Sequence, residues 1–469
     1  MRQIILNEWR LLLRIKILLG LCIGFLLVFV VAIFLSHKQY QKQLTTYTIA
    51  KGELRAQWES IDSMNPHSAA HYGTYVFKPT NLLTNLDEGV NNVTGNVLRV
   101  EGHVQNEMVH SEASQMMSVS KFGKLKAALL LQYIVPLLLI FLAFSSVNSE
   151  RQQGRLKILL LQGAGASRLM ISKALAIWCL GLLLLGLSVL FYALLNFDKL
   201  NVDSLYRLIL FISSYSLYYF SIVSLTVFLT VRFNNSTLVL TSMIGIWILW
   251  TVFVPNVVMS NVEKWHPLPS RDAFKAAMRE DRSKGIDGHN PSDERGKALE
   301  EKILTKYQVD SLSQLPINFD GIRMQEDEEY GNIVWDKHFG NLSDVLEKQK
   351  KNVQWFGFLS PLISLQNSSM GYAGNDNLHH QKFQRQVEDY RRVFIKALND
   401  EHAYGGSKTG DWGWKAQNDF FKSIKDFEYE ATSLKSIWKH YVFDFMVLVL
   451  WSVLSLGLVL YGTKRMVVL

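Results

Sequence analysis

Residues 17–36 read ILLGLCIGFLLVFVVAIFLS, a run of 20 residues without a charged side chain. A helix of about 20 apolar residues crosses the hydrocarbon core of a bilayer, where each backbone polar group must be paired within its own segment. The run is too long for the apolar part of a cleaved signal peptide, and no small-residue cleavage motif follows it. We therefore expect a membrane-spanning helix at this position.

Five further apolar stretches are long enough to cross a bilayer. They lie at residues 127–147, 174–195, 208–231, 237–260 and 441–461. The composition agrees with this, because 49% of the residues are hydrophobic and only 19% are charged. A soluble domain needs more charged residues to cover its surface. The sequence thus predicts an α-helical polytopic membrane protein with six transmembrane helices.

Basic residues in the short segments beside the spans indicate the orientation. The segments assigned to one side are 1–16, 148–173, Arg232 and 462–469. Together they contain 12 basic residues and two acids, a net charge of +10, so the remainder carries −2 of the chain's net +8. Because Lys and Arg accumulate in cytoplasmic loops, we predict that both termini are cytoplasmic. The basic charge is then explained by the orientation of the chain in the lipid membrane, and no nucleic-acid partner is needed.

This orientation places two long polar segments outside the membrane, at residues 37–124 and 261–438. Both cysteines lie in apolar runs, so no disulfide framework holds these segments, and each is expected to fold on its own core. In the first segment, YGTYVF (72–77) and NVLRV (96–100) have the composition of short strands. We expect this first extracytoplasmic insertion to be an α+β domain.

The second extracytoplasmic insertion is predicted to be mainly α-helical. Residues 293–309 and 378–399 carry apolar side chains three and four positions apart among many charges, the pattern of amphipathic surface helices. One face of the later helix is expected to consist of Val387, Tyr390, Val393, Phe394 and Leu398. The acidic run Glu326–Glu329 is interpreted as a solvated face, with attraction of cations or a basic partner as the alternative.

The pattern His67-Ser-Ala-Ala-His71 lies in the first insertion. Residues four apart share one face of a helix, so both imidazoles can hold one metal ion, with His103 or His110 as a further ligand. The Glu of the zincin pattern His-Glu-x-x-His is missing, so a protease is not predicted. Two alternatives stay open: histidines that cap or hydrogen-bond the fold, and a proton-sensitive contact.

Asp444 is the exception in spans that otherwise almost lack ionisable side chains. It lies about one helical turn inside the outer end of the last span. An acid within the membrane marks a functional site as the first hypothesis. So near the interface, however, its carboxylate can instead reach water, and both interpretations stay open.

The segment after the second span reads SVNSERQQGRLKILLLQGAGASRLMISKALAIW (146–178). A Glu-Arg pair, a glycine, a leucine-rich turn, two more glycines and a Ser-Arg pair lead into the third span. This string resembles the signature of type-2 ABC exporter permeases, in which the corresponding loop carries the coupling helix that docks into an ATPase subunit. The resemblance implies an ATPase-coupling role for Glu150, Arg151, Gly154, Arg155, Gly163, Gly165, Ser167 and Arg168.

Residues 1–16 mix aliphatic side chains, Trp9 and basic groups, as a helix lying in the cytoplasmic membrane interface does. This agrees with the same family, and the outer segments narrow the resemblance. NPHSAAHYGTYVFKP (65–79), LPINFDGIRMQEDEEYGN (315–332) and SPLISLQNSSMGYAGNDNLHHQKFQRQVEDYRR (360–392) are similar to the ABC-2 permease subfamily with the domain of unknown function 3526. That subfamily is related by analogy to permeases of multicopper-enzyme maturation.

The resemblance implies a permease subunit of an ABC exporter in the bacterial inner membrane, as a homodimer or as a heterodimer with a sister permease. No cofactor is expected on this chain, and it is not expected to be an enzyme. GGSKTG (405–410) lacks the spacing of a phosphate-binding loop and lies outside, so ATP and Mg²⁺ belong to separate ABC ATPase subunits. Two alternative functions remain: a mechanotransmitting subunit that acts on periplasmic partners, and a membrane-anchored metal-handling or maturation protein that uses His67 and His71.

Overall fold

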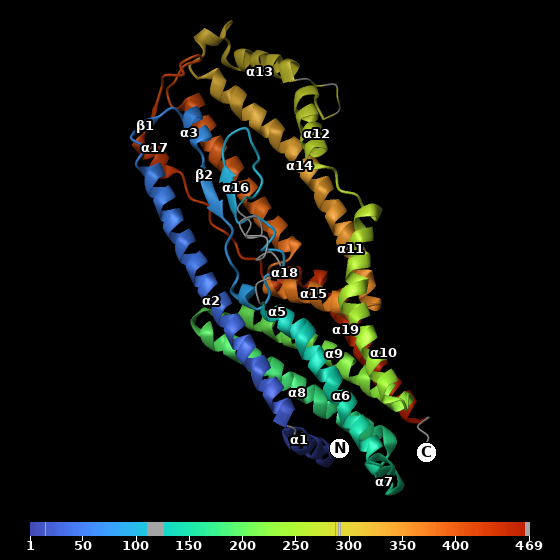
Figure 1. Cartoon of the computed structure of the whole chain (residues 1–469). Helices are drawn as coiled ribbons and strands as arrows, with labels where there is room; N and C mark the ends of the chain where they lie inside the picture. The colour runs from blue at the N-terminus through green and yellow to red at the C-terminus, as the bar shows by residue number, and fades with distance from the viewer. Residues whose placement is uncertain (15, 110–125, 287, 289, 291, 465–469) are drawn as a thin grey trace.

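The computed structural model describes residues 1–14, 16–109, 126–286, 288, 290 and 292–464. Six helices in these ranges are long and apolar enough to cross a membrane, which confirms the predicted polytopic helical architecture. Figure 1 shows an elongated molecule with the short helix α7 (Arg155–Leu161) at one end and α13 (Ser292–Tyr307) at the other. The spans therefore form one part of the molecule and the long insertions form the other.

The candidate spans form a bundle around one central helix. They are α2 (Lys16–Glu59), α6 (Val135–Gln152), α8 (Ala166–Leu195), α9 (Val202–Arg232), α10 with α11 (Ser236–Ile248 and Val254–Trp265) and α19 (Val442–Lys464). Helix α9 packs against α6, α8, α10 and α19. Its Tyr215, Tyr218 and Tyr219 are fully buried in the core of the bundle.

Two of the spans contain a π-helical turn just before a proline. The turn Leu130–Ile134 joins α5 (Ala127–Leu129) to α6, in which Pro136 lies in the first turn. The turn Leu249–Phe253 likewise joins α10 to α11, where Pro255 follows. A proline has no N–H to donate and its ring crowds the preceding turn, so a local change of helical winding accommodates it. Each span continues through its proline.

Helix α2 is much longer than the predicted span. The prediction ended at Ser36, but the helix continues to Glu59, so residues 37–59 extend the first span into the outer part of the molecule. Residues 37–51 contain neither glycine nor proline, so nothing in the sequence ends the helix there. Its 44 residues correspond to about 66 Å, roughly twice the thickness of the hydrocarbon core.

The first insertion contains the two predicted strands. β2 (Thr74–Phe77) and β3 (Val97–Val100) pair antiparallel, with Thr74 opposite Val100 and Phe77 opposite Val97. The short helix α3 (Pro66–Tyr72) precedes them. A second pair joins the two insertions, because β1 (Ser63–Met64) pairs with β4 (Ala416–Gln417).

The second insertion is helical, as predicted. Its helices are α12 (Arg271–Lys284), α13, α14 (Phe319–Trp355), α15 (Pro361–Ala373), α16 (Asn377–Tyr404), α17 (Asn418–Ser423) and α18 (Leu434–Ile437). The prediction for Val393 was wrong, because this side chain is 70% exposed. The buried row of α16 follows the spacing of Val387, Phe394 and Leu398, and Val393 lies to one side of that row.

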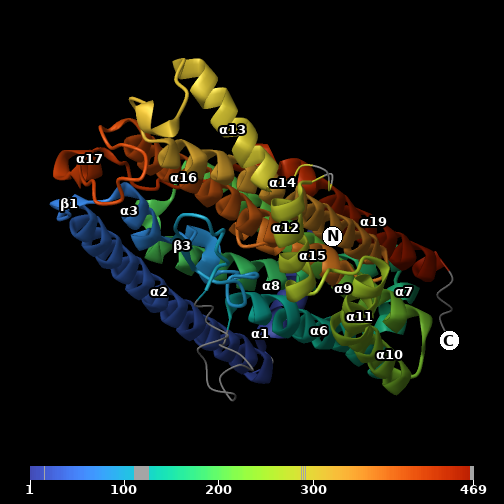
Figure 2. The same cartoon turned by 90° about the horizontal axis from the view of Figure 1, so that it is seen from above.

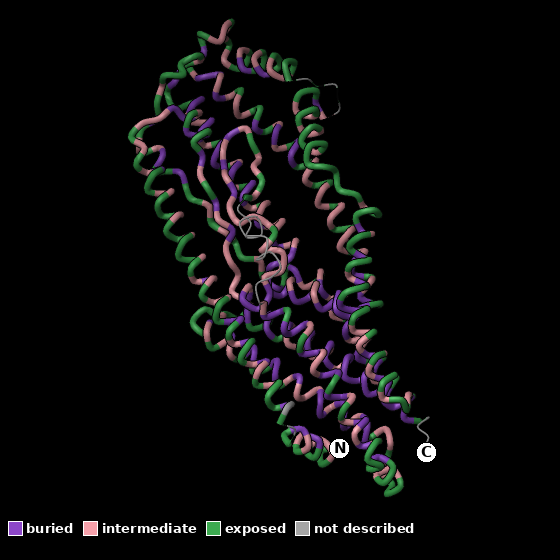
Figure 3. Tube along the Cα trace, in the orientation of Figure 1, coloured by how far each residue is buried: buried purple, intermediate pink, exposed green. Residues whose placement is uncertain are grey.

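The two insertions share a hydrophobic core, so the expectation that each folds on its own core was wrong for the first, while the second also has a cluster of its own around Leu299, Ile303 and Phe319. Trp58 of α2 packs with Val76 of the first insertion and with Phe394 and Phe421 of the second. Figure 2 shows α3 and β3 between α2 and α16. In Figure 3 the buried residues form a band through the bundle and along α16, while much of α2 is exposed. Residues 37–109 and the described residues of 261–438 thus form one body beyond the bundle, which we call the outer body.

Candidate functional site

The short helix α7 lies between the ends of α6 and α8, at the end of the bundle that also carries α1 (Arg2–Arg14) (Figure 1). Gly154 precedes it at φ 72° and Gly163 follows it at φ 87°. Both values lie in the left-handed region, which glycine adopts without the steric cost that a Cβ brings. These two glycines therefore let the chain change direction sharply on each side of α7.

The surface of α7 is apolar at its tip and basic at its flank. Leu156 is buried and belongs to the core of the bundle, whereas Ile158 and Leu161 are 54% and 73% exposed. Arg155 and Lys157 are exposed as well. The helix is thus fixed to the bundle by Leu156, with Leu159 and Leu160 partly buried against the same core, and it presents two large aliphatic side chains outward.

A buried ionic network lies behind α7 and joins three helices. Lys173 of α8 is 1% exposed and contacts the carboxylate of Glu8 on α1 and that of Glu150 on α6, the latter at 3.0 Å between Nζ and Oε1. Its Nζ also donates to the backbone oxygen of Ser146 at 3.2 Å, and the Ser146 hydroxyl donates to Glu8 Oε2 at 2.7 Å. One cation therefore holds two carboxylates from different helices.

Further polar contacts tie this end of the bundle together. Arg151 donates from Nη1 to the backbone oxygen of Phe233, just after α9, at 2.8 Å. The hydroxyls of Ser167 on α8 and Thr463 on α19 are 2.7 Å apart. The indole N–H of Trp9 donates to the Ala176 carbonyl at 3.1 Å. The ends of all these helices are thus linked by side chains.

The residues that the family resemblance singled out differ in exposure, and two of them, Arg151 and Ser167, are partly buried. Gly154, Arg155, Gly163, Gly165 and Arg168 are exposed around α7. Glu150 is instead buried against Lys173, so it is not available as a direct contact for a partner subunit. Sequence reasoning missed Glu8 and the role of Lys173. The signal that could have revealed the pair is Glu8 itself, a lone acid within a basic segment next to the membrane.

A second group of candidate residues lies in the outer body, where α3 presents two histidines. Asn65 caps the helix, its side-chain oxygen accepting from the backbone N–H groups of His67 and Ser68, and Pro66 occupies the first turn. His67 and His71 therefore lie one turn apart on one face. Their Nε2 atoms are 3.2 Å apart.

His103 joins this pair from the loop after β3. Its ring centre lies 5.5 Å from that of His67 and 5.3 Å from that of His71. Among the described residues, these three histidines form a group in which one ligand atom of each lies within 4.8 Å of the others. The other predicted ligand, His110, lies outside the described residues.

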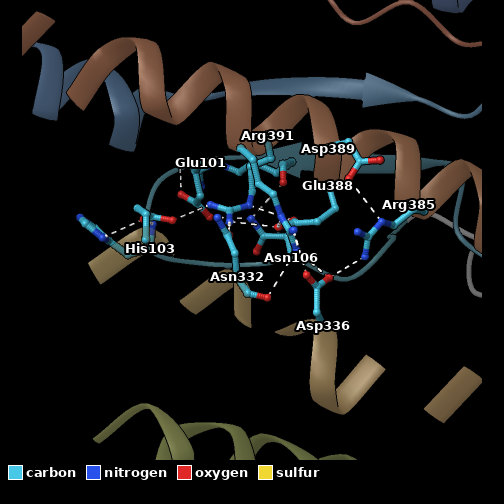
Figure 4. A network of polar contacts seen from close by, with 12 residues as sticks. Glu101, His103, Asn106, Asn332, Asp336, Arg385, Glu388, Asp389 and Arg391 are labelled. Atoms are coloured by element: carbon cyan, nitrogen blue, oxygen red, sulfur yellow. Dashed lines mark hydrogen bonds and ion pairs between the residues drawn. The ribbon is translucent and has the colours of Figure 1, made fainter. Parts of the chain in front are cut away.

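His103 is held by Glu328, a buried carboxylate of the second insertion. Figure 4 shows His103, Glu388 and Arg391 in one polar network. The Nδ1 atom of His103 lies 3.0 Å from Oε1 of Glu328 on α14, and its backbone N–H contacts the same oxygen. Arg391 of α16 donates to Glu328 Oε2 at 2.8 Å and to Glu388 Oε2 at 2.9 Å. The interpretation of the acidic run as a solvated face was thus wrong for Glu328, which is buried.

The surroundings of Glu328 and His67 shift the pKa values of both side chains. Burial raises the pKa of Glu328, but the hydrogen bonds from His103 and the charge of Arg391 outweigh burial and hold the pKa at about 2. Burial, followed by the nearby His71, His103 and His402, lowers the pKa of His67 to about 4. At neutral pH, Glu328 is therefore ionised and the imidazole of His67 is neutral.

Asp444 of α19 does not reach water, so that interpretation was wrong. Its side chain is fully buried. It accepts hydrogen bonds from Gln354 Nε2 of α14 at 2.7 Å and from Asn367 Nδ2 of α15 at 3.3 Å. The carboxylate thus joins the last span to two helices of the outer body.

Comparison with known families gives two matches along the chain. A family model described as ABC-2 family transporter protein matches residues 2–286, and one described as a domain of unknown function (DUF3526) matches residues 271–434. No curated protein and no solved structure matches. The first match covers α7, the first five spans and the three histidines, while Glu328 and Arg391 lie in the second. The resemblance found in the sequence is confirmed.

Proposed function

The chain belongs to the ABC-2 family of transporter proteins, and from this we propose that it is the permease subunit of an ABC exporter whose ATPase subunits drive it through α7. The match to this family and the six spans make it a multi-pass membrane component of an ABC transporter. We further propose that transport runs outward, that α7 lies on the cytoplasmic side, and that α7 contacts the ATPase subunit.

The exposed tip of α7 carries this proposal. Ile158 and Leu161 are large aliphatic side chains left without cover at the end of the bundle. An exposed apolar pair rimmed by basic groups is typical of a protein contact. Arg155 and Lys157 beside it suit an acidic rim on the partner. The partner surface would be a groove on the ATPase subunit.

The network behind α7 gives the contact a mechanical consequence. Movement of α7 reaches α6 and α8 directly, because it is joined to both by short turns. Lys173 then connects these two helices to α1 through Glu8 and Glu150. A closing pair of ATPase subunits would thus move three helices of each permease together as a rigid group.

The remaining assignments follow from this mechanism. ATP and Mg²⁺ are bound by the ATPase subunits, and the chain itself contributes no nucleotide site. Two permease chains, identical or related as sisters, pair in the bacterial inner membrane over two ATPase subunits. Both termini lie on the cytoplasmic side, as the basic residues of the short loops favour.

Substitution of the α7 tip tests the proposal. In the complex purified with its ATPase, Ile158→Ser with Leu161→Ser is expected to reduce permease-stimulated ATP hydrolysis at least tenfold, since burial of two large aliphatic side chains contributes about 3–6 kcal/mol. The matched control is Phe197→Ser with Val202→Ser, an apolar pair at least as exposed, at the opposite end of the bundle. Unchanged hydrolysis in the α7 variant, or equal loss in the control, contradicts the proposal.

A second candidate function is mechanotransmission to periplasmic partners without cargo. It is favoured by α2, a single helix that begins next to α1 and ends with Trp58 in the core of the outer body. Such a helix can pass a movement of the bundle to the outer body. Reconstitution in proteoliposomes separates the two functions: directional, ATP-dependent accumulation of a defined substrate supports export and excludes transmission alone.

A further inference from the structure

We propose that His67, His71 and His103 form a binding site for one divalent transition-metal ion of the zinc class on the outer body. The proposal is independent of the permease mechanism, because it concerns residues far from α7 along the molecule (Figure 1). The main observation in its favour is that α3 and the loop after β3 bring three imidazoles together next to the buried carboxylate of Glu328.

The spacing of the nitrogens fits a tetrahedral ion. Ligand nitrogens that lie 2.0–2.1 Å from a tetrahedral zinc ion are about 3.3–3.4 Å apart. The Nε2 atoms of His67 and His71 are 3.2 Å apart, and a nitrogen of His103 completes a group within 4.8 Å. Binding of an ion would draw these nitrogens closer, toward the spacing of a tetrahedral shell.

The orientation of His103 is set by the groups behind it. Its Nδ1 lies 3.0 Å from the Glu328 carboxylate, which leaves Nε2 as the nitrogen for a metal ion. Metal-binding histidines commonly use their other nitrogen in this way, since a carboxylate partner fixes the ring and its tautomer. Glu328 is itself fixed by Arg391, which is almost fully buried.

The backbone at His103 shows that this position is unusual. Its φ is 62°, a left-handed conformation that a non-glycine residue adopts only against a steric cost. The same residue bonds Glu328 through both its backbone N–H and its ring. The surrounding structure therefore holds this imidazole toward the other two against a local preference.

The chemistry of the three side chains selects the ion. Three imidazoles suit Zn²⁺, Cu²⁺ or Ni²⁺, whereas Ca²⁺ and Mg²⁺ prefer oxygen ligands. His71 is exposed, so the fourth position opens to solvent, where water can complete the coordination. An open site of this kind exchanges its ion with the surrounding solution.

A bound ion would connect the two insertions. Its ligands come from α3 and from the loop after β3, while the carboxylate behind His103 comes from α14 and the guanidinium from α16. All three ligands therefore lie in the first family-matched segment, and the groups that hold His103 in place lie in the second. Metal binding is expected to raise the thermal stability of the outer body.

Zinc titration of the full chain tests the proposal. Protein purified in detergent is stripped with a chelator, and Zn²⁺ binding is followed by calorimetry and elemental analysis. The wild type is expected to bind one equivalent, and His71→Ala with His103→Ala to lose it. His338→Ala is the matched control, because it removes another imidazole paired with a carboxylate, that of Asp281.

A conservative variant tests the positioning role of Glu328. Glu328→Gln is expected to weaken zinc binding roughly 10- to 100-fold, the usual effect of losing a group behind a metal ligand. Its Co²⁺ form should show an altered visible spectrum, which a merely structural change elsewhere does not produce. The proposal is overturned if the wild type binds no more zinc than the double histidine variant, or if His338→Ala loses as much.

Discussion

Lys173 is the residue on which the α7 end of the bundle depends most. Burying a cation is costly unless it is paired, and here one Nζ serves the carboxylates of Glu8 and Glu150. The group stabilises a particular arrangement of α1, α6 and α8 more than it stabilises the fold as a whole. Its members must therefore be changed together if the arrangement is to be kept.

Replacement of Lys173 gives the first prediction at this scale. Lys173→Met leaves two carboxylates buried without their cation, which should cost about 3–5 kcal/mol and lower the melting temperature of the purified protein. Adding Glu8→Gln and Glu150→Gln removes both charges and should restore most of the loss. Lys157→Met, at an exposed position on α7, is the control and should change stability little. Failure of the triple variant to recover would show that the charges are not the cause.

Single residues were predictable where their partners are close in the chain. The spacing of His67 and His71 sufficed to place two imidazoles on one face, and α3 confirms it. The support of this site by Glu328 and Arg391 was not predictable. His103 and Glu328, which are in contact, lie 225 positions apart in the sequence. An acidic run usually lies in water, and nothing local distinguishes the one member that is buried.

At the scale of elements, α7 owes its position to the glycines beside it. Gly163 has φ 87° and open space around it, so only its backbone conformation restricts substitution. Gly165, two residues later, has φ −62° and directly precedes α8 as its N-cap residue. The two glycines look alike in the sequence, but only one of them requires the freedom of glycine.

This difference gives a paired prediction for α7. Gly163→Val forces a β-branched residue into the left-handed region at a cost of about 1–2 kcal/mol, so the turn should rearrange and displace α7. We expect permease-stimulated ATP hydrolysis to fall while the protein still assembles with its ATPase. Gly165→Ala should leave hydrolysis near the wild-type rate. Equal rates for both variants would show that the turn geometry does not matter for coupling.

The presence of the helices was predictable, and their ends were less so. Apolar runs gave all six spans, because the hydrocarbon core imposes a length and a composition that the sequence records locally. The continuation of α2 to Glu59 was missed, since beyond Ser36 its side chains become polar while its backbone stays helical. The exposed Val393 was missed because apolar character alone does not place a residue on a face.

At the scale of the whole molecule, the outer body is one unit built from two distant segments. Trp58, Val76, Phe394 and Phe421 pack in one core, and the pairing of β1 with β4 joins the same segments. The two insertions are far apart in the sequence, and they come into contact only when the chain folds. In the proposed mechanism, a movement that begins at α7 would reach this single body through α2 and α19.

The central claim is that α7 is where the ATPase subunit drives this permease, and site-directed cross-linking tests it most directly. Leu161→Cys, in a background with Cys22→Ser and Cys179→Ser, is labelled with a photoreactive thiol reagent in membranes that contain the ATPase. We predict a cross-linked product of permease and ATPase that changes in yield when ATP is added. Phe197→Cys, at the opposite end of the bundle, should give none. A cross-link to the ATPase from Phe197→Cys, or its absence from Leu161→Cys in an assembled complex, would contradict the account.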